Sequence, residues 1–270
     1  MIEIRNLVRR YGDLTAVDNL SLSVPAGELF CFLGPNGAGK TTTIKVLTGL
    51  IRPTSGTAVV AGFDVQREPL EAKKRIGYIP DMPYLYDRLT ATEYVEFVGD
   101  LYRIPRSKML PELERLFSLL GLDEYRSALV KDLSHGYRQR LIYAATLIHD
   151  PQVLFVDEPL IGLDPRTIRL IKELLKQRAR AGMTIFLTTH ILALAEDIAD
   201  RVGIICNGRM IALGTLAELR AVHGDSTLEN IFLRLTASDD DIPGIGLAGQ
   251  PATGAAPEPP RATRSLHGAG

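Results

Sequence analysis

The feature that most restricts the fold of this chain is a glycine-rich segment that directly follows an apolar run. The run, Leu29–Leu33, is continuous and therefore typical of a β-strand buried on both faces. The stretch Thr42–Leu50 beyond the segment continues as a helical pattern. The segment fits G-x-x-x-x-G-K-[ST], and its residues are Gly34, Pro35, Asn36, Gly37, Ala38, Gly39, Lys40 and Thr41. Strand, glycine loop and helix predict a phosphate site, because successive backbone N–H groups can surround phosphate oxygens at a helix N-terminus.

The side chains at the end of this loop suit a nucleotide with its metal ion. Lys40 can reach the β- and γ-phosphates, and the Thr41 hydroxyl can ligate Mg²⁺. We add the adjoining Thr42 to the residues expected to contact nucleotide. The alternative interpretation of the segment is a glycine-rich structural turn.

Short apolar runs alternate with helical patterns along most of the chain, which predicts an α/β core with a parallel sheet. The first two runs flank Tyr11-Gly12-Asp13 and predict an antiparallel pair. The predicted strands are Ile2–Val8, Val17–Val24, Leu29–Leu33, Thr57–Ala61, Ile76–Ile79, Val153–Val156, Thr184–Leu187, Val202–Cys206 and Arg209–Leu213. The predicted helices between the later strands are Arg166–Ala181 and Ile191–Ala199.

One segment, about 86–150, interrupts this alternation. It contains three helical patterns in succession, Thr92–Leu101, Pro111–Leu120 and Tyr137–His149. We therefore expect a helical subdomain inserted into the core.

Two acidic residues follow an apolar strand at Val153–Val156. Asp157 and Glu158 should lie at the carboxyl edge of the sheet, where ligands of open α/β folds bind. Because adjacent strand residues point to opposite faces, we expect the two carboxylates to have different roles. Asp157 suits a metal ion and its water shell, and Glu158 suits the orientation and deprotonation of an attacking water. The alternative is a solvated strand end without function.

A histidine reaches the same edge from another strand. His190 follows the run Thr184–Leu187 and two threonines, and its ring N–H could contact a γ-phosphate. A lone histidine is more often structural or exposed, and that alternative stays open on the position alone.

Composition narrows the possible partners and compartment. The 31 Lys plus Arg and 32 Asp plus Glu give a formal net charge of −1, so the chain lacks the basic excess of nucleic-acid-binding proteins and we expect no nucleic-acid partner. No apolar run approaches the ~18 residues of a membrane span, and the N-terminus has no hydrophobic signal region. Two cysteines, Cys31 and Cys206, favour a reducing compartment. We expect a cytoplasmic chain.

The composition changes near residue 236. From Ala237 to Gly270 the chain holds three successive aspartates, then mostly Gly, Ala and Pro, without an aromatic residue. Such a segment cannot bury enough apolar surface to offset the entropy lost on ordering. We expect a folded unit over 1–235 and a disordered tail over 236–270, the alternative being a short extension that lies on the body.

In combination, these motifs resemble the nucleotide-binding cassette of ABC ATPases over residues 1–235. The phosphate loop, Asp157-Glu158, the segment Gly162–Pro165 and His190 stand in the order and spacing of that family. The segment Leu133–Arg140 is similar to the family's signature motif. The resemblance implies an α/β fold with a P-loop NTPase core, an N-terminal antiparallel β subdomain and the inserted helical subdomain, with ATP and Mg²⁺ as cofactors.

The resemblance also assigns residues outside the phosphate loop. Ser134 and Gly136 correspond to an anion site at a helix start that, in the family, caps the γ-phosphate held by a second cassette, so that two ATP molecules lie in a head-to-tail dimer. Tyr11 corresponds to the aromatic residue that stacks on adenine, or is only a hairpin-tip tyrosine. Asp164 corresponds to an acid that communicates across the dimer, and it can equally cap the helix that begins at Pro165.

Three positions depart from the family pattern. Asp81 stands where the family usually has a glutamine whose oxygen touches Mg²⁺ and water; a carboxylate can also ligate the metal, or Asp81 points elsewhere and its loop only acts as a hinge. His135 replaces a glycine of the signature, and Ile161 replaces a small serine before Gly162. Since Lys40, Thr41, Asp157, Glu158 and His190 remain, we still predict ATP hydrolysis. The relaxed motifs resemble cassettes of ABC-2-type exporters.

These considerations favour an ATPase subunit that powers a membrane transporter, an exporter, with integral membrane subunits as partners. It would lie at the inner face of the membrane through those subunits. Tyr84 and Tyr86, in a loop after Asp81, are candidates for the groove that receives the membrane subunit, whereas Tyr94 and Phe97 are expected in the core of the helical subdomain. The alternatives are a soluble ABC ATPase acting on ribosomes, DNA or division machinery, and a nucleotide switch that does not hydrolyse.

Overall fold

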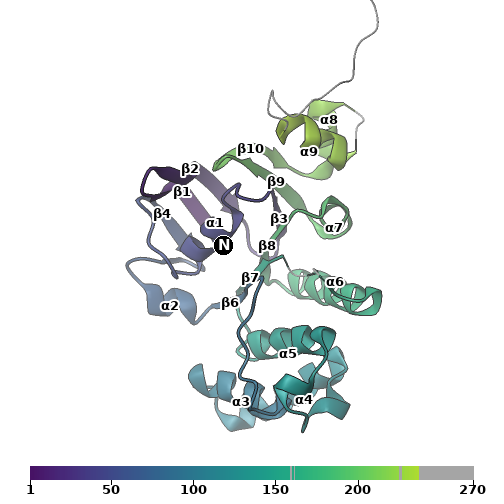
Figure 1. Ribbon diagram of the computed structural model, residues 1–270. Coiled ribbons are helices and arrows are strands. Elements are labelled where there is room, and N and C mark those ends of the chain that lie inside the picture. The colour runs from purple at the N-terminus through teal and green to yellow at the C-terminus, as the bar shows by residue number, and fades with distance from the viewer. Residues whose placement is uncertain (159, 161, 225–226, 237–270) are drawn as a thin grey trace, which may run out of the picture. The chain divides into compact units, whose positions relative to one another are not determined.

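Two β-sheets, one mainly parallel and one antiparallel, organise the chain (Figure 1). The computed structural model describes residues 1–158, 160, 162–224 and 227–236. The predicted tail from Ala237 onward and the substitution at Ile161 lie outside the described residues. Thr236, which the sequence placed in the tail, is the last residue of helix α9 (Leu228–Thr236).

The larger sheet has the strand order β10-β9-β3-β8-β7-β6. All neighbouring strands are parallel except β9 and β10, which form an antiparallel edge. Every residue of β3, β7 and β8 is buried, as their continuous apolar runs predict. The strands are β3 (Leu29–Leu33), β6 (Ile76–Ile79), β7 (Val153–Asp157), β8 (Thr184–Thr189), β9 (Arg201–Cys206) and β10 (Arg209–Gly214).

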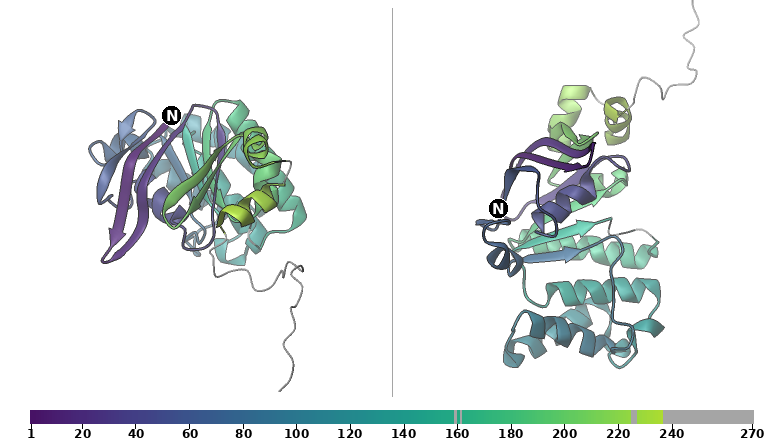
Figure 2. Two further views of the ribbon diagram at one scale, coloured as in Figure 1. Left: turned by 90° about the horizontal axis from the view of Figure 1, so that it is seen from above. Right: turned by 60° about the vertical axis from the view of Figure 1, so that its left-hand side comes forward.

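Each face of this sheet has its own hydrophobic core. Leu29, Cys31 and Leu33 pack with the core that includes α6 (Pro165–Arg180) and α7 (Leu192–Ile198). Phe30 and Phe32 point to the other face, where they pack with α1 (Lys40–Leu47) and the second sheet. The larger sheet therefore lies between a layer that contains α6 and α7 and a layer that contains α1 and the antiparallel sheet (Figures 1 and 2).

The antiparallel sheet has the order β2-β1-β4-β5. Its hairpin is longer than predicted: β1 extends over Ile2–Tyr11 and β2 over Leu14–Val24, because pairing continues to Tyr11 and Leu14 at the tip. β4 (Ser55–Val60) and the short β5 (Phe63–Asp64) complete the sheet, and α2 (Pro69–Lys73) leads to β6.

The helical subdomain connects β6 to β7, as predicted. It contains α3 (Ala91–Leu101), α4 (Arg106–Leu120) and α5 (His135–Leu147), with short 3₁₀ turns at Asp123–Tyr125 and Val130–Asp132. Helix α4 begins before Pro111, where the sequence predicted its start, because the buried stripe of the helix already begins at Met109. The predicted fold class, with its antiparallel and helical subdomains, is confirmed.

The last described elements were not predicted. Helix α8 (Leu216–His223) follows Thr215, whose hydroxyl and the Glu218 carboxylate form a reciprocal capping box. Helix α9 packs against α7 and α8. Among the helices of the described residues, none is long and apolar enough to cross a membrane.

Candidate functional site

The glycine loop is tightly fitted between β3 and neighbouring backbone. A Cβ atom on Gly34 would lie 2.4 Å from the carbonyl oxygen of Ile205, and one on Gly39 would lie 2.3 Å from that of Ala16. Gly39 also has φ +106°, a conformation that L-residues with side chains rarely adopt. Gly37, at φ +79°, would meet nothing within 4 Å, so the loop is open on that side. The glycines of the motif are thus required by the shape of the loop.

Lys40, the first residue of α1, is almost fully buried at the base of this loop. Its ammonium group donates hydrogen bonds to the carbonyl oxygens of Gly34 at 2.7 Å and Pro35 at 3.1 Å. Burial lowers the pKa of the ammonium group, and the carboxylates of Glu158 and Asp157 oppose that shift. The remaining predicted loop residues divide by exposure: Ala38 is buried, Pro35 and Thr42 are half-buried, and Asn36, Gly37 and Thr41 are exposed.

Asp157, the last residue of β7, is 1% exposed. The hydroxyl of Thr188, its partner across β8, donates a short hydrogen bond to Oδ1. Oδ2 is buried and has no hydrogen-bond partner in the part of the chain that the structure describes. A buried carboxylate oxygen without a donor is costly, so Oδ2 is suited to a cation or a water held by one.

Glu158 joins the loop lysine to the strand-end histidine. Its Oε1 lies 3.0 Å from His190 Nδ1 and 3.8 Å from Lys40 Nζ, and its Oε2 is buried without a hydrogen-bond partner among residues that the structure describes. Strand β7 ends at Asp157, and Glu158 has φ +50°. We had expected the alternation of side chains along a strand to separate Asp157 from Glu158. That reason was wrong, because Glu158 lies beyond the end of β7.

Asp81 reaches the same region from the end of β6. It lines a cleft of about 570 Å³ together with Glu158, Gly162 and His135. Burial raises the pKa of the nearby Tyr78 to about 12, with further contributions from Asp157 and Asp81. The structure thus brings Asp81 to the cleft that contains Glu158.

Two signature residues, Ser134 and Gly136, are not among the residues that line this cleft, although His135 between them is. Ser134 is exposed and is the N-cap of α5, where its hydroxyl accepts a long 3.5 Å hydrogen bond from Tyr137 N–H. A Cβ on Gly136 would lie 3.3 Å from Asp164 Oδ2. Within the described part of the chain, no hydrogen bond or ion pair joins Ser134 or Gly136 to the phosphate loop. His135 is the first residue of α5 and has no positive φ, so glycine is not required there.

Asp164 is the N-cap of α6. It accepts hydrogen bonds from the N–H groups of Arg166 and Thr167 and from the Thr167 hydroxyl at 2.7 Å. These bonds, the Thr167 hydroxyl first, hold the pKa of the Asp164 carboxyl below its usual range. The capping alternative for Asp164 is therefore present in the structure.

The hairpin tip carries Tyr11, which is 43% exposed. Gly208, in the turn between β9 and β10, connects this hairpin to the phosphate loop through its backbone. Its N–H donates to Ala38 O at 3.0 Å, and its carbonyl oxygen accepts from Asp18 N–H at 2.9 Å. The Arg9 guanidinium lies over the Tyr11 ring, 4.3 Å from its centroid.

Two side chains that contact predicted site residues were not identified in the sequence analysis. Thr188, which holds Asp157, could have been found from the pair of threonines before His190, because it faces Asp157 across parallel strands. Arg9 could have been found from the period of a strand, which places residues 9 and 11 on one face.

The side chains present fit an ATP–Mg²⁺ complex. Gly34 and Gly39 leave no room for a Cβ atom, Asp157 Oδ2 and Glu158 Oε2 have no hydrogen-bond partner among the described residues, and Thr41 is exposed next to Lys40 at the start of α1. In the described ranges, no three His, Cys, Asp or Glu side chains group so that they alone could hold a metal ion. A metal ion at this site would have phosphate oxygens among its ligands, beside those of the protein.

The fold and this site define a phosphate-loop nucleotide-binding protein. A family model described as ABC transporter matches residues 17–161. The daunorubicin/doxorubicin resistance ATP-binding protein DrrA of Streptomyces peucetius is 40% identical over 227 residues, which cover 84% of this chain and 69% of that protein. The chain belongs to the ABC transporter family and is an ATP-binding cassette.

Some relatives are much longer than this chain. The probable multidrug ABC transporter ATP-binding protein YbhF of Escherichia coli is 36% identical over 240 residues, which cover 87% of this chain but 41% of that protein. The chain thus spans about two fifths of that relative's length.

Solved structures show the same fold. An ATP-binding subunit of an ABC transporter matches with a TM-score of 0.82 and 30% identity, over 87% of this chain and 99% of that one. A bacterial ABC transporter cassette described as dimeric matches with a TM-score of 0.73 and 26% identity, over 80% of this chain and 99% of that one.

Proposed function

We propose that the chain is the ATP-hydrolysing subunit of a membrane transporter, and that this transporter is an exporter. One observation carries the hydrolytic part: a single carboxylate, Glu158, lies between the loop lysine Lys40 and the strand-end histidine His190. The names of the relatives support the transport part, since they describe drug resistance and multidrug transport.

The residues of the site have separate roles in ATP hydrolysis. The N–H groups of Gly34–Thr42 bind the phosphate oxygens, and Lys40 neutralises charge on the β- and γ-phosphates. Glu158 orients the attacking water and accepts its proton. His190 donates a hydrogen bond to the γ-phosphate and restrains the Glu158 carboxylate through the 3.0 Å contact.

Thr41, Asp157 and Asp81 are the residues that would hold Mg²⁺, through a hydroxyl and carboxylate oxygens. When bound, the ion neutralises the charge that develops on the phosphates. The hydrogen bond from Thr188 to Oδ1 restrains the Asp157 carboxylate and leaves Oδ2 for the ion or its water.

The complete site needs a second cassette. Ser134 is exposed at the N-terminus of α5, where its hydroxyl and the N–H of Gly136 can bind an anion. Neither residue is bonded to the phosphate loop of its own chain, so the phosphate they bind is that of a partner cassette. The dimeric description of one structural relative agrees with this arrangement. Tyr11 stacks on the adenine of the ATP bound by its own loop.

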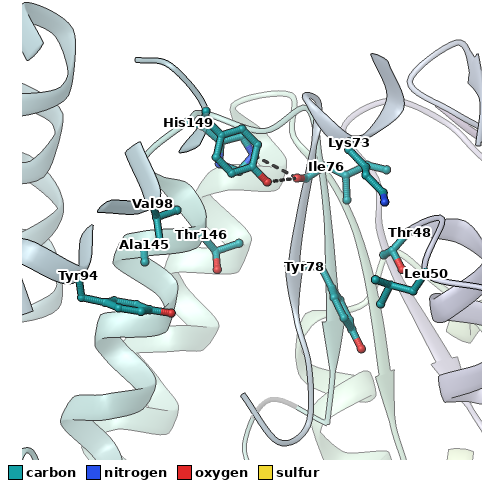
Figure 3. A pocket seen from close by; sticks show the side chains of 11 residues that line it. Thr48, Leu50, Lys73, Ile76, Tyr78, Tyr94, Val98, Ala145, Thr146 and His149 are labelled. Carbon is teal, nitrogen blue, oxygen red and sulfur yellow. Dashed lines mark hydrogen bonds between the residues drawn. The ribbon is translucent and has the colours of Figure 1, made fainter. Parts of the chain in front are cut away.

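A groove beside β6 suits the membrane subunit (Figure 3). This groove, of about 370 Å³, is lined by Tyr78 from β6, Tyr94 and Val98 from α3, Leu50 after α1, and Lys73 from α2. Its lining is mostly apolar. Lys73 has no hydrogen-bond or ion-pair partner in the described part of the chain, so a helical segment of the membrane subunit that carries a carboxylate would complement it.

Exposed aromatic residues continue this groove. Tyr84 is 85% exposed and Tyr86 is 50% exposed, and the Tyr86 ring lies 6.4 Å from that of Tyr94 and 5.3 Å from that of Phe97. We expected Phe97 in the core, but it is 38% exposed, and its ring packs against that of Tyr86, which is exposed as well. The aromatic cluster and the groove form one surface for docking, which would place the chain at the inner face of the membrane.

Substitution of Glu158 tests the proposal. Glu158→Gln keeps the size and hydrogen bonding of the side chain but cannot accept a proton, so we expect phosphate release to fall by roughly 100-fold or more while ATP still binds. With ATP and Mg²⁺, this variant should double its mass in light scattering, and Glu158→Gln combined with Ser134→Ala should remain monomeric.

Glu173→Gln, at an exposed position on α6, is the matched control and should hydrolyse ATP at the unmodified rate. Equal phosphate release from the unmodified chain and Glu158→Gln would show a switch that does not hydrolyse. Copurification with ribosomes instead of membrane proteins would overturn the transport role.

A further inference from the structure

The hairpin next to the phosphate loop contains an arginine that ATP hydrolysis does not use. Arg9 and Tyr11 are two residues apart on β1 and so face the same side. The Arg9 guanidinium lies over the Tyr11 ring, 4.3 Å from the centroid. One of its terminal nitrogens donates a 3.0 Å hydrogen bond to the carbonyl oxygen of Arg52, and its Nε is buried with no hydrogen-bond partner among the described residues.

These contacts show which face of the tyrosine ring is covered. Arg9 is half-buried and tied to the Arg52 backbone, whereas Tyr11 is 43% exposed. The guanidinium therefore occupies one face of the ring and is itself held by the protein backbone. The opposite face of the ring remains available for a flat ligand.

The carbonyl of Arg52 links the Arg9 side chain to the nucleotide site, because Arg52 lies shortly after α1, the helix that begins at Lys40. The hairpin is also fixed to the loop directly, since the Ala16 carbonyl occupies the space beside Gly39. The orientation of the Tyr11 ring is thus set relative to the same helix and loop that hold the phosphates.

We infer that Arg9 is a positioning residue for the purine base: it supports the Tyr11 ring from behind, so that the open face is presented to adenine. This inference rests on the proposed stacking role of Tyr11. A cation on one face attracts the ring's electrons, and a ring already held in its bound rotamer loses less entropy when the base stacks on it. Arg9 therefore contributes to affinity for the base and not for the phosphates.

A binding experiment separates these contributions. Dissociation constants for ATP and for inorganic tripolyphosphate are measured by calorimetry in the Glu158→Gln background, where hydrolysis does not interfere. Arg9→Ala should weaken ATP binding about fivefold, because a single cation–π contact changes affinity by roughly tenfold or less. The same substitution should leave tripolyphosphate binding unchanged. Arg9→Gln, which retains part of the side chain's packing, should show the same selectivity.

A double-mutant cycle tests whether Arg9 acts through Tyr11. In a Tyr11→Ala background, Arg9→Ala should cause no further loss of ATP affinity. Arg10→Ala is the control, because Arg10 is the same residue type, is adjacent in sequence and is exposed. Melting temperatures of all variants verify that they are folded.

Each other outcome overturns the inference. Unchanged or tighter ATP binding by Arg9→Ala would show that the guanidinium does not support the ring. An equal loss for tripolyphosphate, or a further loss in the Tyr11→Ala background, would show that Arg9 acts on the phosphates or the fold. If Tyr11→Ala alone leaves ATP affinity unchanged, the stacking role and this inference both fail, whereas phosphate release by the unmodified chain still tests the proposed hydrolysis.

Discussion

At the scale of the residue, Glu158 combines a candidate catalytic side chain with an unfavourable backbone conformation. A non-glycine residue at φ +50° costs on the order of 1–3 kcal/mol. The cost is offset by the surrounding structure, since Glu158 N–H donates to Thr188 O at 3.1 Å and its carboxylate contacts His190 and Lys40. The strained conformation moves the carboxylate out of the strand and into the cleft.

A glycine of the phosphate loop gives the prediction at this scale. Gly39→Ala should lower the free energy of unfolding by more than Gly12→Ala, because both positions have positive φ but only the Cβ at 39 would collide with backbone, at 2.3 Å from Ala16 O. The conformational cost of each is about 1–2 kcal/mol, and the collision adds to it. Urea unfolding of both variants measures the difference, and equal losses would contradict the steric argument.

Single residues of the site were predictable where chemistry demands a residue type. Lys40, Asp157, Glu158 and His190 were identified from motif and strand-end position, and the structure brings them together. Their catalytic roles remain predictions. The left-handed backbone of Glu158 and the bond from Thr188 were not predictable, since both depend on where β7 ends and on its register with β8.

At the scale of the element, two helix N-caps can be compared. Thr90 and Glu93 form a reciprocal capping box at α3, with bonds of 3.2 and 2.8 Å, whereas the Ser134 cap of α5 is a single 3.5 Å bond. Thr90→Ala should therefore cost ~1 kcal/mol of stability and Ser134→Ala much less. ATP hydrolysis should show the reverse order, because Ser134 is proposed to bind phosphate.

Chemical denaturation and a phosphate-release assay on the two variants check this pair of expectations. A large loss of stability in Ser134→Ala would show that the serine serves the helix and not the nucleotide.

The junction of the helical subdomain with β6 gives a pH-dependent prediction. His149 stacks on Tyr102 with ring centroids 3.7 Å apart. Its Nε2 lies 3.1 Å from Ile76 O, a contact drawn as a dashed line in Figure 3. Burial lowers the pKa of His149 to about 4, although the Ile76 carbonyl and Asp150 oppose the shift. The unfolded chain therefore binds a proton more readily than the folded one, and stability falls as pH decreases from about 6.5 to about 4.

His149→Phe retains the stacking but cannot titrate. The stability difference between the unmodified chain and this variant should change by on the order of 3 kcal/mol across that window and be constant above pH 7. Urea midpoints at half-unit pH intervals measure it, and a flat difference would mean that the ring is solvated.

Elements with strong periodicity were predictable, and their ends were not. The strands Leu29–Leu33 and Ile76–Ile79 have the predicted bounds. The hairpin and α4 extend further because cross-strand pairing and the burial of Met109 add residues that local pattern does not mark. Helices α8 and α9 are short and depend on contacts with other elements, α8 with β10 and α9, and α9 also with α7.

At the scale of the whole molecule, the docking surface gives the last prediction. Tyr84→Ala and Tyr86→Ala should reduce the amount of membrane subunit that copurifies from detergent-solubilised membranes, while ATP affinity stays unchanged. Lys73→Glu should reduce it further, since it reverses the charge in the groove. Val222→Ala, at a 76% exposed apolar position on α8, is the control.

Mass spectrometry identifies the membrane protein, and melting temperature separates the two interpretations of the tyrosines. A lower melting temperature in Tyr84→Ala or Tyr86→Ala would favour core packing over docking.

The architecture was predictable as a whole because alternating strands and helices admit few topologies. The sequence contained the order of elements, and so the edge at which Asp157, Glu158 and His190 meet. It did not contain the distances on which the docking groove and the Arg9–Tyr11 contact depend, because these arise from packing between segments far apart in the chain.

The carbonyl group of Ala16, in β2, occupies the space that a Cβ atom on Gly39 would need, and this close contact joins the hairpin to the phosphate loop. The smallest fragment able to keep the loop in shape therefore cannot begin at β3; it must include the first two strands. A shortened version that starts after Val24 should bind nucleotide poorly even though every motif residue from Gly34 onward is present. Engineering that transplants this loop into another protein has to carry its hairpin neighbour as well.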